Sequence, residues 1–596
     1  MIEPRSKIKQ NENQRHSGAW GKTEVVALVL ACMLVLGSTA VAGNKKTGDD
    51  LDVQSSGLVN VIVQYADGPS TTHADKAKKH GATVKQDQQL VKATVMSLPA
   101  NQIAGLLADD SNITYVSPDR VVKSTGYTDG FVAVNTDVAQ SYGYTGSGIG
   151  VAVIDSGIST AQPDLSKRVV YSQDFTGQGK TDDLYGHGTH VAGIIAGNGG
   201  KSSCGSCFVT YEGVAQGVKL INLRALDSYG FGTDSNVIAA IQTAINLKNQ
   251  YNIRVINLSL GRGIFESYQT DPLTQAVEQA WKAGIFVVVA AGNFGRFSVN
   301  GSNGYGTITS PGNDPYVITV GAMRTMGTQT RVDDAIASYS SKGPSMLDHV
   351  VKPDLVAPGN LVASTLAQNA SLNTLFPSTL LPLKAYQNTS STANSTYYFT
   401  LSGTSMAAPV VSGAAALMFQ KDSALTPDQV KARMMKAAFK NLPLYTTATD
   451  PLIGVTYNAQ ADMFTVGAGY LDIAAALNNT DSIPTGSGIA RSPIAVYDAT
   501  TGQVSLVTGY SVLWGSSVLW GSSVLWGNSV VWGNSVIWGT NTSGQSVLWG
   551  SSVVWGTSTN SGFSVVWGSS TAPMSVVWGS SNTGSDATSV VAYGDN

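Results

Sequence analysis

The chain has 596 residues, of which 43% are hydrophobic and 13% are charged, and it contains 64 glycines and 20 prolines. This composition excludes a collagen-like, coiled-coil or highly charged disordered protein, and the length is sufficient for several units with separate cores. The formal net charge is −3, and the basic residues are scattered rather than clustered. Nucleic acid is therefore not an expected partner.

The N-terminal residues have the order of a secretory signal. Basic residues precede an apolar run at 25–36, and small residues follow it up to Ala42. The run is shorter than the roughly 20 residues that a membrane-spanning helix needs, although extending it to Ala42 approaches that length. We expect residues 1–42 to be a cleaved signal peptide, with a retained anchor as the alternative, and the protein to be secreted or at the cell surface.

A small α+β module is predicted ahead of the main domain. Short apolar runs alternate with polar ones in the order β-α-β-β-α-β, which is typical of a split sheet covered by two helices. The expected strands are residues 58–65, 82–90, 92–98 and 113–116, and the expected helices are residues 73–80 and 102–108.

From residue 146 to about 478, apolar strands alternate with helical stretches. This pattern predicts an α/β domain with a mainly parallel sheet flanked by helices. The expected strands are residues 149–154, 220–225, 255–260 and 285–290, and the expected helices are residues 235–247 and 273–283.

The last part of the chain is repetitive. Residues 481–596 contain five charged residues, and the unit Ser-Val-(Leu, Val or Ile)-Trp-Gly holds nine of the 11 tryptophans. The first repeats are six residues apart, an even number, so an extended chain keeps the tryptophans of these repeats on one face. We expect residues 479–596 to be a linker and a β-type or partly disordered repeat tail. Its apolar face either packs on neighbouring repeats or on the main domain, or binds the cell surface or another copy.

Two cysteines remain once the expected signal peptide is removed. Cys204 and Cys207 lie in a Gly- and Ser-rich stretch that reads as a loop. In an oxidising compartment we expect them to form a small disulfide, with free thiols or a redox Cys-x-x-Cys motif as alternatives.

Four residues of the main domain indicate chemistry. Asp155 ends an expected strand, where open α/β sheets place their sites. His187 lies among small residues at the start of an apolar helical run, and Ser405 begins another small-residue helical stretch. Asn293 follows the strand that ends at residue 290.

These residue types fit nucleophilic catalysis. A serine hydroxyl is a poor nucleophile until an imidazole removes its proton, and a carboxylate must orient that imidazole. Backbone N–H groups at a helix N-terminus and an asparagine amide can stabilise the oxyanion. Taken singly, each residue would be read as a structural cap, and only their joint occurrence favours catalysis. His187 and His190 lack the acidic motif of a metal helix, and we expect His190 to be packed or hydrogen-bonded.

The segments around these residues, in the order Asp, His, Asn, Ser, resemble the subtilisin-like (subtilase) serine endopeptidases. The resemblance covers residues 146 to about 478 and implies a subtilisin-like fold. It implies Ser405 as nucleophile, His187 as general base and acid, Asp155 as the orienting carboxylate and Asn293 as oxyanion donor. No cofactor is required for this chemistry.

The resemblance also extends to substrate-binding segments. Residues 257–261 resemble the strand that pairs with substrate, residues 229–233 the opposing strand, and residues 310–312 the wall of the first pocket. The substrate-binding residues that the resemblance implies are Ser259, Leu260, Gly261, Gly230, Gly232 and Gly312.

The remaining domains follow from the same likeness. Residues 43–125, with a core at 58–122, resemble the family's inhibitory propeptide, which implies autocleavage between about residues 122 and 130. The catalytic domain then spans residues 126–478. Asp164 matches a family calcium ligand, although the loop 198–211 departs from the family pattern and the residue could instead cap a turn. A polar insertion at 366–398 is expected to form a surface flap.

Together these features predict an exported endopeptidase that acts on proteins or peptides through an acyl-enzyme on Ser405 and is inhibited by its own propeptide until that is removed. One alternative is a surface or adhesive protein whose repeat tail provides the main function and whose peptidase only matures it. A hydrolase of non-peptide esters is a more distant alternative.

Overall fold

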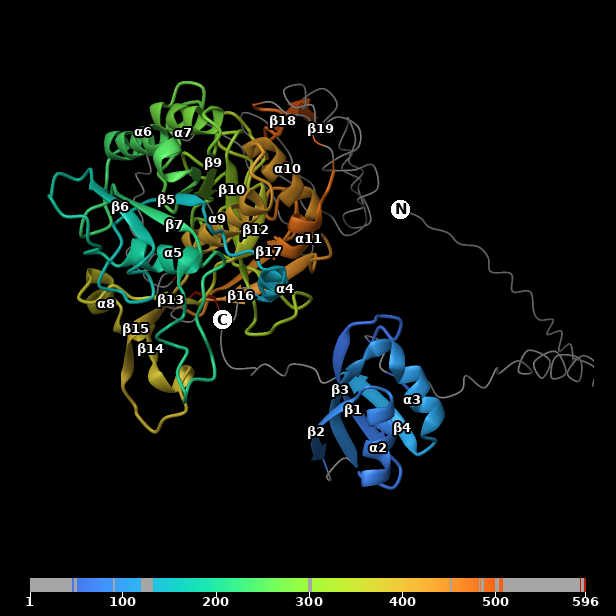
Figure 1. The fold of residues 1–596 in the computed structure, drawn as a ribbon. Coiled ribbons are helices and arrows are strands. Elements are labelled where there is room, and N and C mark those ends of the chain that lie inside the picture. Colours follow the sequence, from blue (N-terminus) through green and yellow to red (C-terminus); the bar gives the residue numbers. More distant parts are fainter. Residues whose placement is uncertain are drawn as a thin grey trace, which may run out of the picture. The chain divides into compact units, whose positions relative to one another are not determined.

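A computed structural model describes residues 46–47, 51–88, 92–118, 132–297, 303–450, 453–481, 483, 487–498, 503–507, 590 and 594–595. The chain forms two compact units, Met1–Lys123 and Ser124–Asn596 (Figure 1). The expected signal peptide and the tryptophan repeats lie outside the described residues. None of the described helices combines the length and apolar character needed to cross a membrane.

The first unit is an antiparallel sheet with two helices. Its elements are β1 (Leu58–Tyr65), α2 (Thr71–Lys79), β2 (Thr83–Gln88), β3 (Ala93–Pro99), α3 (Ile103–Asp109) and β4 (Ile113–Pro118). The strand order is β2-β3-β1-β4, and Val61, Val63 and Met96 alternate inward to meet Ile103 and Leu106 from α3. The predicted order β-α-β-β-α-β is confirmed.

The second unit is built on a sheet of eight strands in the order β11-β10-β9-β8-β5-β7-β6, with β12 paired to β10. All pairs are parallel except β10 with β11. The strands are β5 (Gly150–Asp155), β6 (Val169–Asp174), β7 (Lys219–Arg224), β8 (Ile253–Leu258), β9 (Phe286–Ala290), β10 (Ile318–Arg324), β11 (Ala335–Ile336) and β12 (Leu355–Pro358). This confirms the predicted fold class.

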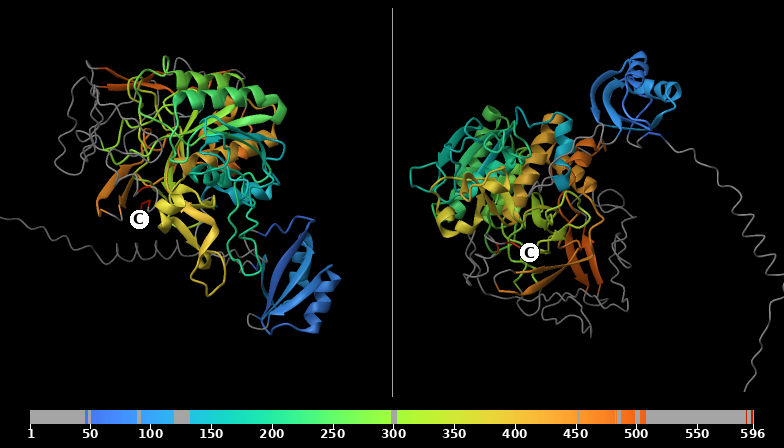
Figure 2. Two further views of the ribbon diagram at one scale, coloured as in Figure 1. Left: turned by 90° about the vertical axis from the view of Figure 1, so that its left-hand side faces the viewer. Right: turned by 90° about the horizontal axis from the view of Figure 1, so that it is seen from below.

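Helices cover both faces of this sheet, which explains why its central strands are almost entirely buried and rich in apolar residues. α5 packs against α9 on one side, and α6 packs against α7 on the other (Figures 1 and 2). Every residue of β5, β9 and β10 is buried. The helices are α4 (Thr136–Ser141), α5 (His187–Ala196), α6 (Asp234–Tyr251), α7 (Pro272–Lys282), α8 (Ser371–Leu375), α9 (Thr404–Lys421), α10 (Pro427–Ala437) and α11 (Ile473–Asn478).

Smaller sheets lie outside this central one. The insertion expected as a surface flap forms α8 and part of a three-stranded sheet in the order β13-β15-β14. Two hairpins pair β16 with β17 and β18 with β19. Their strands are β13 (Val362–Thr365), β14 (Leu380–Pro382), β15 (Asn394–Leu401), β16 (Tyr445–Thr449), β17 (Thr456–Gln460), β18 (Ile494–Asp498) and β19 (Gln503–Val507).

Within the second unit, described residues beyond 478 pack against the domain that contains the central sheet. The Asp428 carboxylate on α10 accepts hydrogen bonds from the N–H groups of Gly488 and Ala490, at 3.2 and 2.7 Å. Val590 is 4% exposed and belongs to the main hydrophobic core. The segment expected to be a separate tail therefore contacts the sheet domain on both sides of the undescribed residues 508–589.

Candidate active site

His187 and Asp155 form a buried polar pair. Asp155 is the last residue of β5, and His187 is the first residue of α5. Nδ1 of His187 lies 2.7 Å from Oδ1 of Asp155, and the two side chains are 0% and 1% exposed. A ring that donates from Nδ1 to the carboxylate keeps Nε2 as its basic nitrogen. The pair is thus arranged for His187 to accept a proton at Nε2.

Ser156 ties this pair to the start of α5. Its N–H donates to Oδ1 of Asp155 at 2.7 Å, and its hydroxyl donates to Oδ1 of Asp183 at 2.9 Å. The same hydroxyl accepts from the N–H of Gly188 at 2.9 Å, so it satisfies one of the first N–H groups of the helix. A Cβ at Gly188 would lie 2.2 Å from a backbone oxygen, so only glycine allows the helix to approach this closely.

Asp183 completes the support of α5. Its carboxylate accepts from the N–H groups of Tyr185, Gly186 and Thr189 at 3.2, 2.7 and 2.7 Å. Burial raises the pKa of Asp183, and the N–H donors of Gly186 and Thr189 oppose that shift. The sequence reading missed this residue. The available signal was an acid shortly before the helix that begins at His187, which is a helix-capping pattern.

His190 is a structural neighbour. Its Nε2 lies 2.9 Å from the carbonyl oxygen of Val362, and its ring meets Phe399 edge-on at a centroid distance of 4.9 Å. Burial, with a smaller contribution from the charge of His187, lowers the pKa of His190 to about 3. The ring is therefore neutral and donates to Val362, which confirms the expected packed, hydrogen-bonded role.

Ser405 lies in the first turn of α9, which packs against α5. Its side chain is buried, and its hydroxyl donates to the carbonyl oxygen of Ser259 at 3.1 Å. In return the Ser259 hydroxyl donates to the carbonyl oxygen of Ser405 at 2.8 Å. Pro409 explains why that oxygen accepts from outside the helix, because proline lacks the N–H that would bond to the residue four positions earlier. Ser405 is thus tied to an expected substrate-binding segment.

Asn293 is held by the residue that precedes Ser405. Oδ1 of Asn293 accepts from the backbone N–H of Thr404 at 2.9 Å and from its hydroxyl at 3.1 Å. With Oδ1 occupied by these donors, the Nδ2 group is the end of the amide that can donate to a ligand. The Thr404 hydroxyl also accepts from the N–H of Gly292 at 3.1 Å. The sequence reading missed Thr404, although it stands beside the expected nucleophile.

The expected substrate-binding segments lie around Arg262. Residues 259–261 follow β8, and no backbone–backbone hydrogen bond reaches them within the described part of the chain. Just beyond them, Arg262 and Ser310 exchange two backbone hydrogen bonds of 2.9 and 2.8 Å, which fixes the segment that contains Gly312. Nε of Arg262 donates at 2.9 Å to Asp234, which begins α6 directly after residues 229–233. An extended segment without backbone partners can accept a peptide as an added strand.

Two glycines of these segments are required by close packing. Gly230 has a φ of +80°, and a Cβ there would lie 2.6 Å from the ring of Tyr185. A Cβ at Gly261 would lie 2.5 Å from Oγ1 of Thr309. Larger residues at either position would displace the walls of the segment. Leu260 is 7% exposed and Ser259 is fully buried, so Ser259 contributes through its backbone and hydroxyl to the surroundings of Ser405.

Asp164, the candidate calcium ligand, is surrounded by hydrogen-bond donors. Its Oδ1 accepts from the N–H of Lys201 at 3.0 Å, and its Oδ2 accepts from the hydroxyl of Tyr398. Calcium needs six to eight oxygen ligands, and these neighbours present N–H and O–H donors instead. The described residues also contain no cluster of three or more His, Cys, Asp or Glu side chains that could hold a metal. The surroundings of Asp164 do not fit a calcium ion.

The expected disulfide between Cys204 and Cys207 is present. Its loop is bound to the insertion, because the N–H of Phe208 donates to the carbonyl oxygen of Tyr386 at 2.9 Å. The same insertion reaches the segment before His187, where the N–H of Leu372 donates to the carbonyl oxygen of Tyr185 at 3.0 Å. The loop 198–211 and the insertion 366–398, which depart from the family pattern, are thus hydrogen-bonded to each other beside the site.

Known proteins support the same interpretation. The family model described as "Subtilase family" matches residues 146–469. Serine protease AprX of Bacillus subtilis (strain 168) is 35% identical over 396 residues, which cover 64% of this chain and 82% of that protein. Subtilisin J of Geobacillus stearothermophilus is 30% identical over 401 residues, which cover 65% of this chain and 88% of that protein.

Subtilisin DY of Bacillus licheniformis is 33% identical over 310 residues, which cover 52% of this chain and 90% of that protein. The family match spans the strand that carries Asp155 and the helices that begin at His187 and Thr404. The family match agrees with the buried Asp–His pair and with the serine on a neighbouring helix. The chain belongs to the subtilase family and is a serine endopeptidase.

Proposed function

We propose that the protein is exported and hydrolyses peptide bonds in proteins through an acyl-enzyme on Ser405, after its N-terminal module has been cut away. The observation that carries the catalytic assignment is the 2.7 Å contact between Nδ1 of His187 and Oδ1 of Asp155 at the start of the helix that packs against α9. This contact selects the ring tautomer that a general base needs.

In the proposed mechanism, the Ser405 hydroxyl turns from the Ser259 carbonyl toward His187. Nε2 of His187 takes the hydroxyl proton as Oγ attacks the carbonyl carbon of the scissile bond. Asp155 stabilises the resulting imidazolium, which then gives its proton to the leaving amine nitrogen. The imidazole then takes a proton from water as the water oxygen attacks the acyl carbon. It returns this proton to Oγ of Ser405 as the bond to the acyl carbon breaks and the carboxylic acid product is released.

The negative oxygen formed in each tetrahedral intermediate needs donors. Nδ2 of Asn293 is suited to this because Thr404 holds the other end of the amide. Backbone N–H groups in the first turn of α9 supply further donors and a favourable dipole. The substrate chain would pair with residues 259–261 on one side and with Gly230 and Gly232 on the other.

Broad specificity is proposed for the first pocket. Its expected wall, residues 310–312, contains no acid. A neighbouring carboxylate, on Asp271, accepts from the Ser310 hydroxyl at 2.8 Å and is paired with Arg262 at 2.8 Å. Because the Asp271 carboxylate is fully buried and already bound by Arg262 and the Ser310 hydroxyl, it is not presented to a basic substrate residue.

The first unit is proposed to be the inhibitory propeptide, with residues 43–125 removed by the enzyme itself. The unit has its own sheet and hydrophobic core, which supports a module that folds separately. Secretion is proposed from the order of basic, apolar and small residues in 1–42. The tryptophan repeats are proposed to attach the enzyme to a cell surface or to another copy.

A comparison of variants tests these proposals. The chain that follows residue 42 is expressed as wild type, as Ser405→Ala and as Ser423→Ala, a matched control because Ser423 is an exposed surface serine. Masses are followed over time, and denatured casein is added once processing stops. We expect only Ser405→Ala to keep its first unit and to leave casein intact.

The other outcomes separate the proposals. If Ser405→Ala matures and degrades casein like the wild type, the catalytic assignment is wrong. If the wild type matures but leaves casein and other unfolded proteins intact, its peptidase serves maturation only, and the repeats become the main functional part. Unchanged fractionation and oligomeric state after deletion of residues 508–580 would remove the attachment role.

A further inference from the structure

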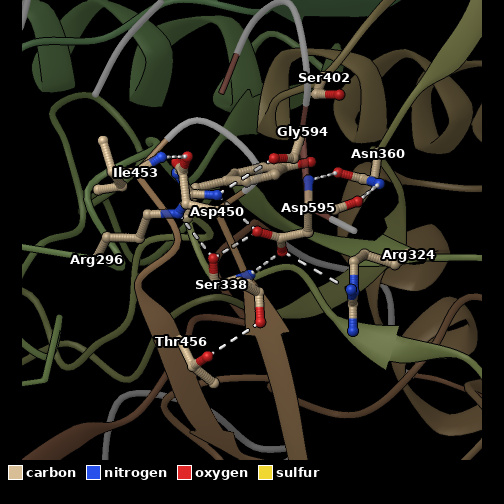
Figure 3. A network of polar contacts seen from close by, with 12 residues as sticks. Arg296, Arg324, Ser338, Asn360, Ser402, Asp450, Ile453, Thr456, Gly594 and Asp595 are labelled. Carbon is tan, nitrogen blue, oxygen red and sulfur yellow. Dashed lines mark hydrogen bonds and ion pairs between the residues drawn. The ribbon is translucent and has the colours of Figure 1, made fainter. Parts of the chain in front are cut away.

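The segment that follows the tryptophan repeats returns to the catalytic domain. Asp595 is 3% exposed, although it stands in a part of the sequence almost without charge. Figure 3 shows its side chain between Arg296, Ser338 and Arg324, which come from different parts of the chain. Nothing in the proposed mechanism uses this residue, so its burial needs another explanation.

The Asp595 carboxylate is fully engaged by donors. Its Oδ1 lies 2.7 Å from Nη2 of Arg296 and accepts from the Ser338 hydroxyl at 2.6 Å. Its Oδ2 accepts from the backbone N–H of Ser338 at 2.6 Å. The Ser338 hydroxyl in turn accepts from Nε of Arg296 at 2.8 Å, which closes a three-residue network. A buried carboxylate with an ion pair and two hydrogen bonds is a specific contact.

The backbone around Asp595 is recognised as well. Asn360 accepts from the N–H of Asp595 through Oδ1 at 2.8 Å and donates to its carbonyl oxygen through Nδ2 at 3.1 Å. The preceding Gly594 has a φ of +58°, and a Cβ there would lie 2.6 Å from the hydroxyl oxygen of Ser402. Both the side chain and the backbone of this segment therefore fit the surface that receives them.

Arg296 and Ser338, the partners of the Asp595 carboxylate, connect it to the loop of Asn293. Arg296 lies three residues after Asn293 on the same loop. The segment of Ser338 holds that loop, because the N–H of Gly295 donates to the Tyr339 carbonyl oxygen at 2.8 Å. Two residues further on, the Ser341 hydroxyl accepts from the N–H of Phe294 at 3.1 Å.

Asn360, the partner of the Asp595 backbone, connects Asp595 to the segment before Ser405. Its neighbours in the chain, Gly359 and Leu361, form hydrogen bonds with the two residues that precede α9. The Gly359 carbonyl oxygen accepts from the N–H of Gly403 at 2.8 Å, and the N–H of Leu361 donates to the Ser402 hydroxyl oxygen at 2.8 Å. Asp595 thus joins the loop of Asn293 to the segment that runs into Ser405. These two parts meet again at the hydrogen bond between Asn293 and Thr404.

We propose that Asp595 is a positioning residue for the oxyanion site, because it holds the loop of Asn293 and the segment before Ser405 in one arrangement. This inference rests on the proposed function of Asn293 and Ser405. It implies that the part of the chain beyond the repeats supports catalysis in addition to any role the repeats have.

The test compares Asp595→Asn with Asp428→Asn. Asp428 is a matched control because it is also a buried carboxylate that binds a segment beyond residue 478, through Gly488 and Ala490. kcat and KM are measured on a peptide amide, per active site titrated with an irreversible serine reagent. We expect Asp595→Asn to lower kcat about tenfold, with KM changed less than about twofold, since misplaced oxyanion donors act on the transition state. Asp428→Asn should lower thermal stability but keep kcat.

A double mutant separates positioning from general damage. In an Asn293→Ala background the donor to be positioned is gone, so adding Asp595→Asn should lower kcat much less than it does in the wild type. If Asp595→Asn folds poorly, Asn360→Ala removes the two backbone hydrogen bonds instead and should show the same pattern. A wild-type kcat for both variants, or an equal loss in the Asn293→Ala background, would overturn the inference.

Failure of the inference can be told from failure of the proposed function. If the wild type hydrolyses the peptide and Ser405→Ala does not, the proposed function stands whatever Asp595→Asn does. If Ser405→Ala remains active, the catalytic assignment fails first.

Discussion

Asp183 offers the sharpest test of how the fold positions His187. In Asp183→Asn, Oδ1 can still accept from Ser156, Tyr185 and Gly186, but the amide NH₂ then faces the N–H of Thr189, which donates to Oδ2 at 2.7 Å in the native protein. The variant loses one hydrogen bond to a charged acceptor, roughly 1.5–3 kcal/mol, and the negative charge at the start of α5, about 0.3–1 kcal/mol. We expect a destabilisation of about 2–4 kcal/mol.

Stability is best measured in a Ser405→Ala background, where self-digestion does not distort the unfolding curve. The expected destabilisation lowers the melting temperature by about 3–6 °C in a domain of this size. Asp182→Asn is the matched control, because Asp182 is the exposed neighbour and its substitution should leave the melting temperature unchanged. In the active enzyme, Asp183→Asn should lower kcat about tenfold, since a displaced His187 is a poorer base.

Two results would refute this reasoning. Equal melting temperatures for Asp183→Asn and Asp182→Asn would mean that the bond to Thr189 does not stabilise the helix. A lower melting temperature with an unchanged kcat per titrated site would mean that the cap stabilises α5 without positioning His187.

Three further predictions address other parts of the molecule. Thr404→Val keeps the shape of the side chain but removes the hydroxyl that donates to Asn293, a hydrogen bond worth about 0.5–1.5 kcal/mol. We therefore expect kcat to fall about 2- to 10-fold in Thr404→Val and to stay near the wild-type value in Thr404→Ser. Equal losses of kcat in the two variants would contradict the role of the hydroxyl. Cys204→Ser opens a disulfide with a sequence separation of 3, so stability should fall by no more than about 2 kcal/mol at unchanged kcat, as urea unfolding and peptide assays can check. Burial raises the pKa of Asp334 to about 7, so the native state holds a proton that the unfolded state releases near pH 4. The unfolding free energy should therefore fall relative to Asp334→Asn between about pH 4 and 7 and level off above, and parallel pH profiles would contradict this in Ser405→Ala chains.

In the central sheet, the strands that the sequence predicted are those with almost every residue buried. β5, β7, β8 and β9 are rich in apolar residues that stand close together in the chain, so they can be recognised without knowing their neighbours. β6 was missed because it lies at the edge of the sheet and five of its six residues are only partly buried, so polar residues interrupt it. β10 was missed although it is fully buried, since Gly321 breaks the run at a point where a Cβ would lie 2.9 Å from the Ser340 hydroxyl oxygen.

In the site, too, only part of the residues could be predicted from the sequence. Asp155, His187, Asn293 and Ser405 stand in segments with a recognisable order, so a reading along the chain finds them. Asp183 has a local helix-capping pattern, but the other supporting residues are identified by partners that lie far away in the sequence, as Thr404 is by Asn293. Asp595 is the extreme case, because its ion pair with Arg296 spans 299 residues and its own short segment matches no motif that would indicate a buried contact.

The placement of Asp595 changes how the repeats should be considered. As a simple tail, residues 479–596 could be lost without effect on the active site. The described residues before and after the repeats instead contact the same domain, through Ala490 on Asp428 and through Asp595 on Arg296. One cut within the repeats would then leave the segment of Val590 and Asp595 held only by its non-covalent contacts, which are hydrogen bonds, ion pairs and the burial of Val590. If the positioning role holds, processing of the repeats would be linked to the rate of peptide hydrolysis, and the enzyme's activity would report whether that segment has stayed bound.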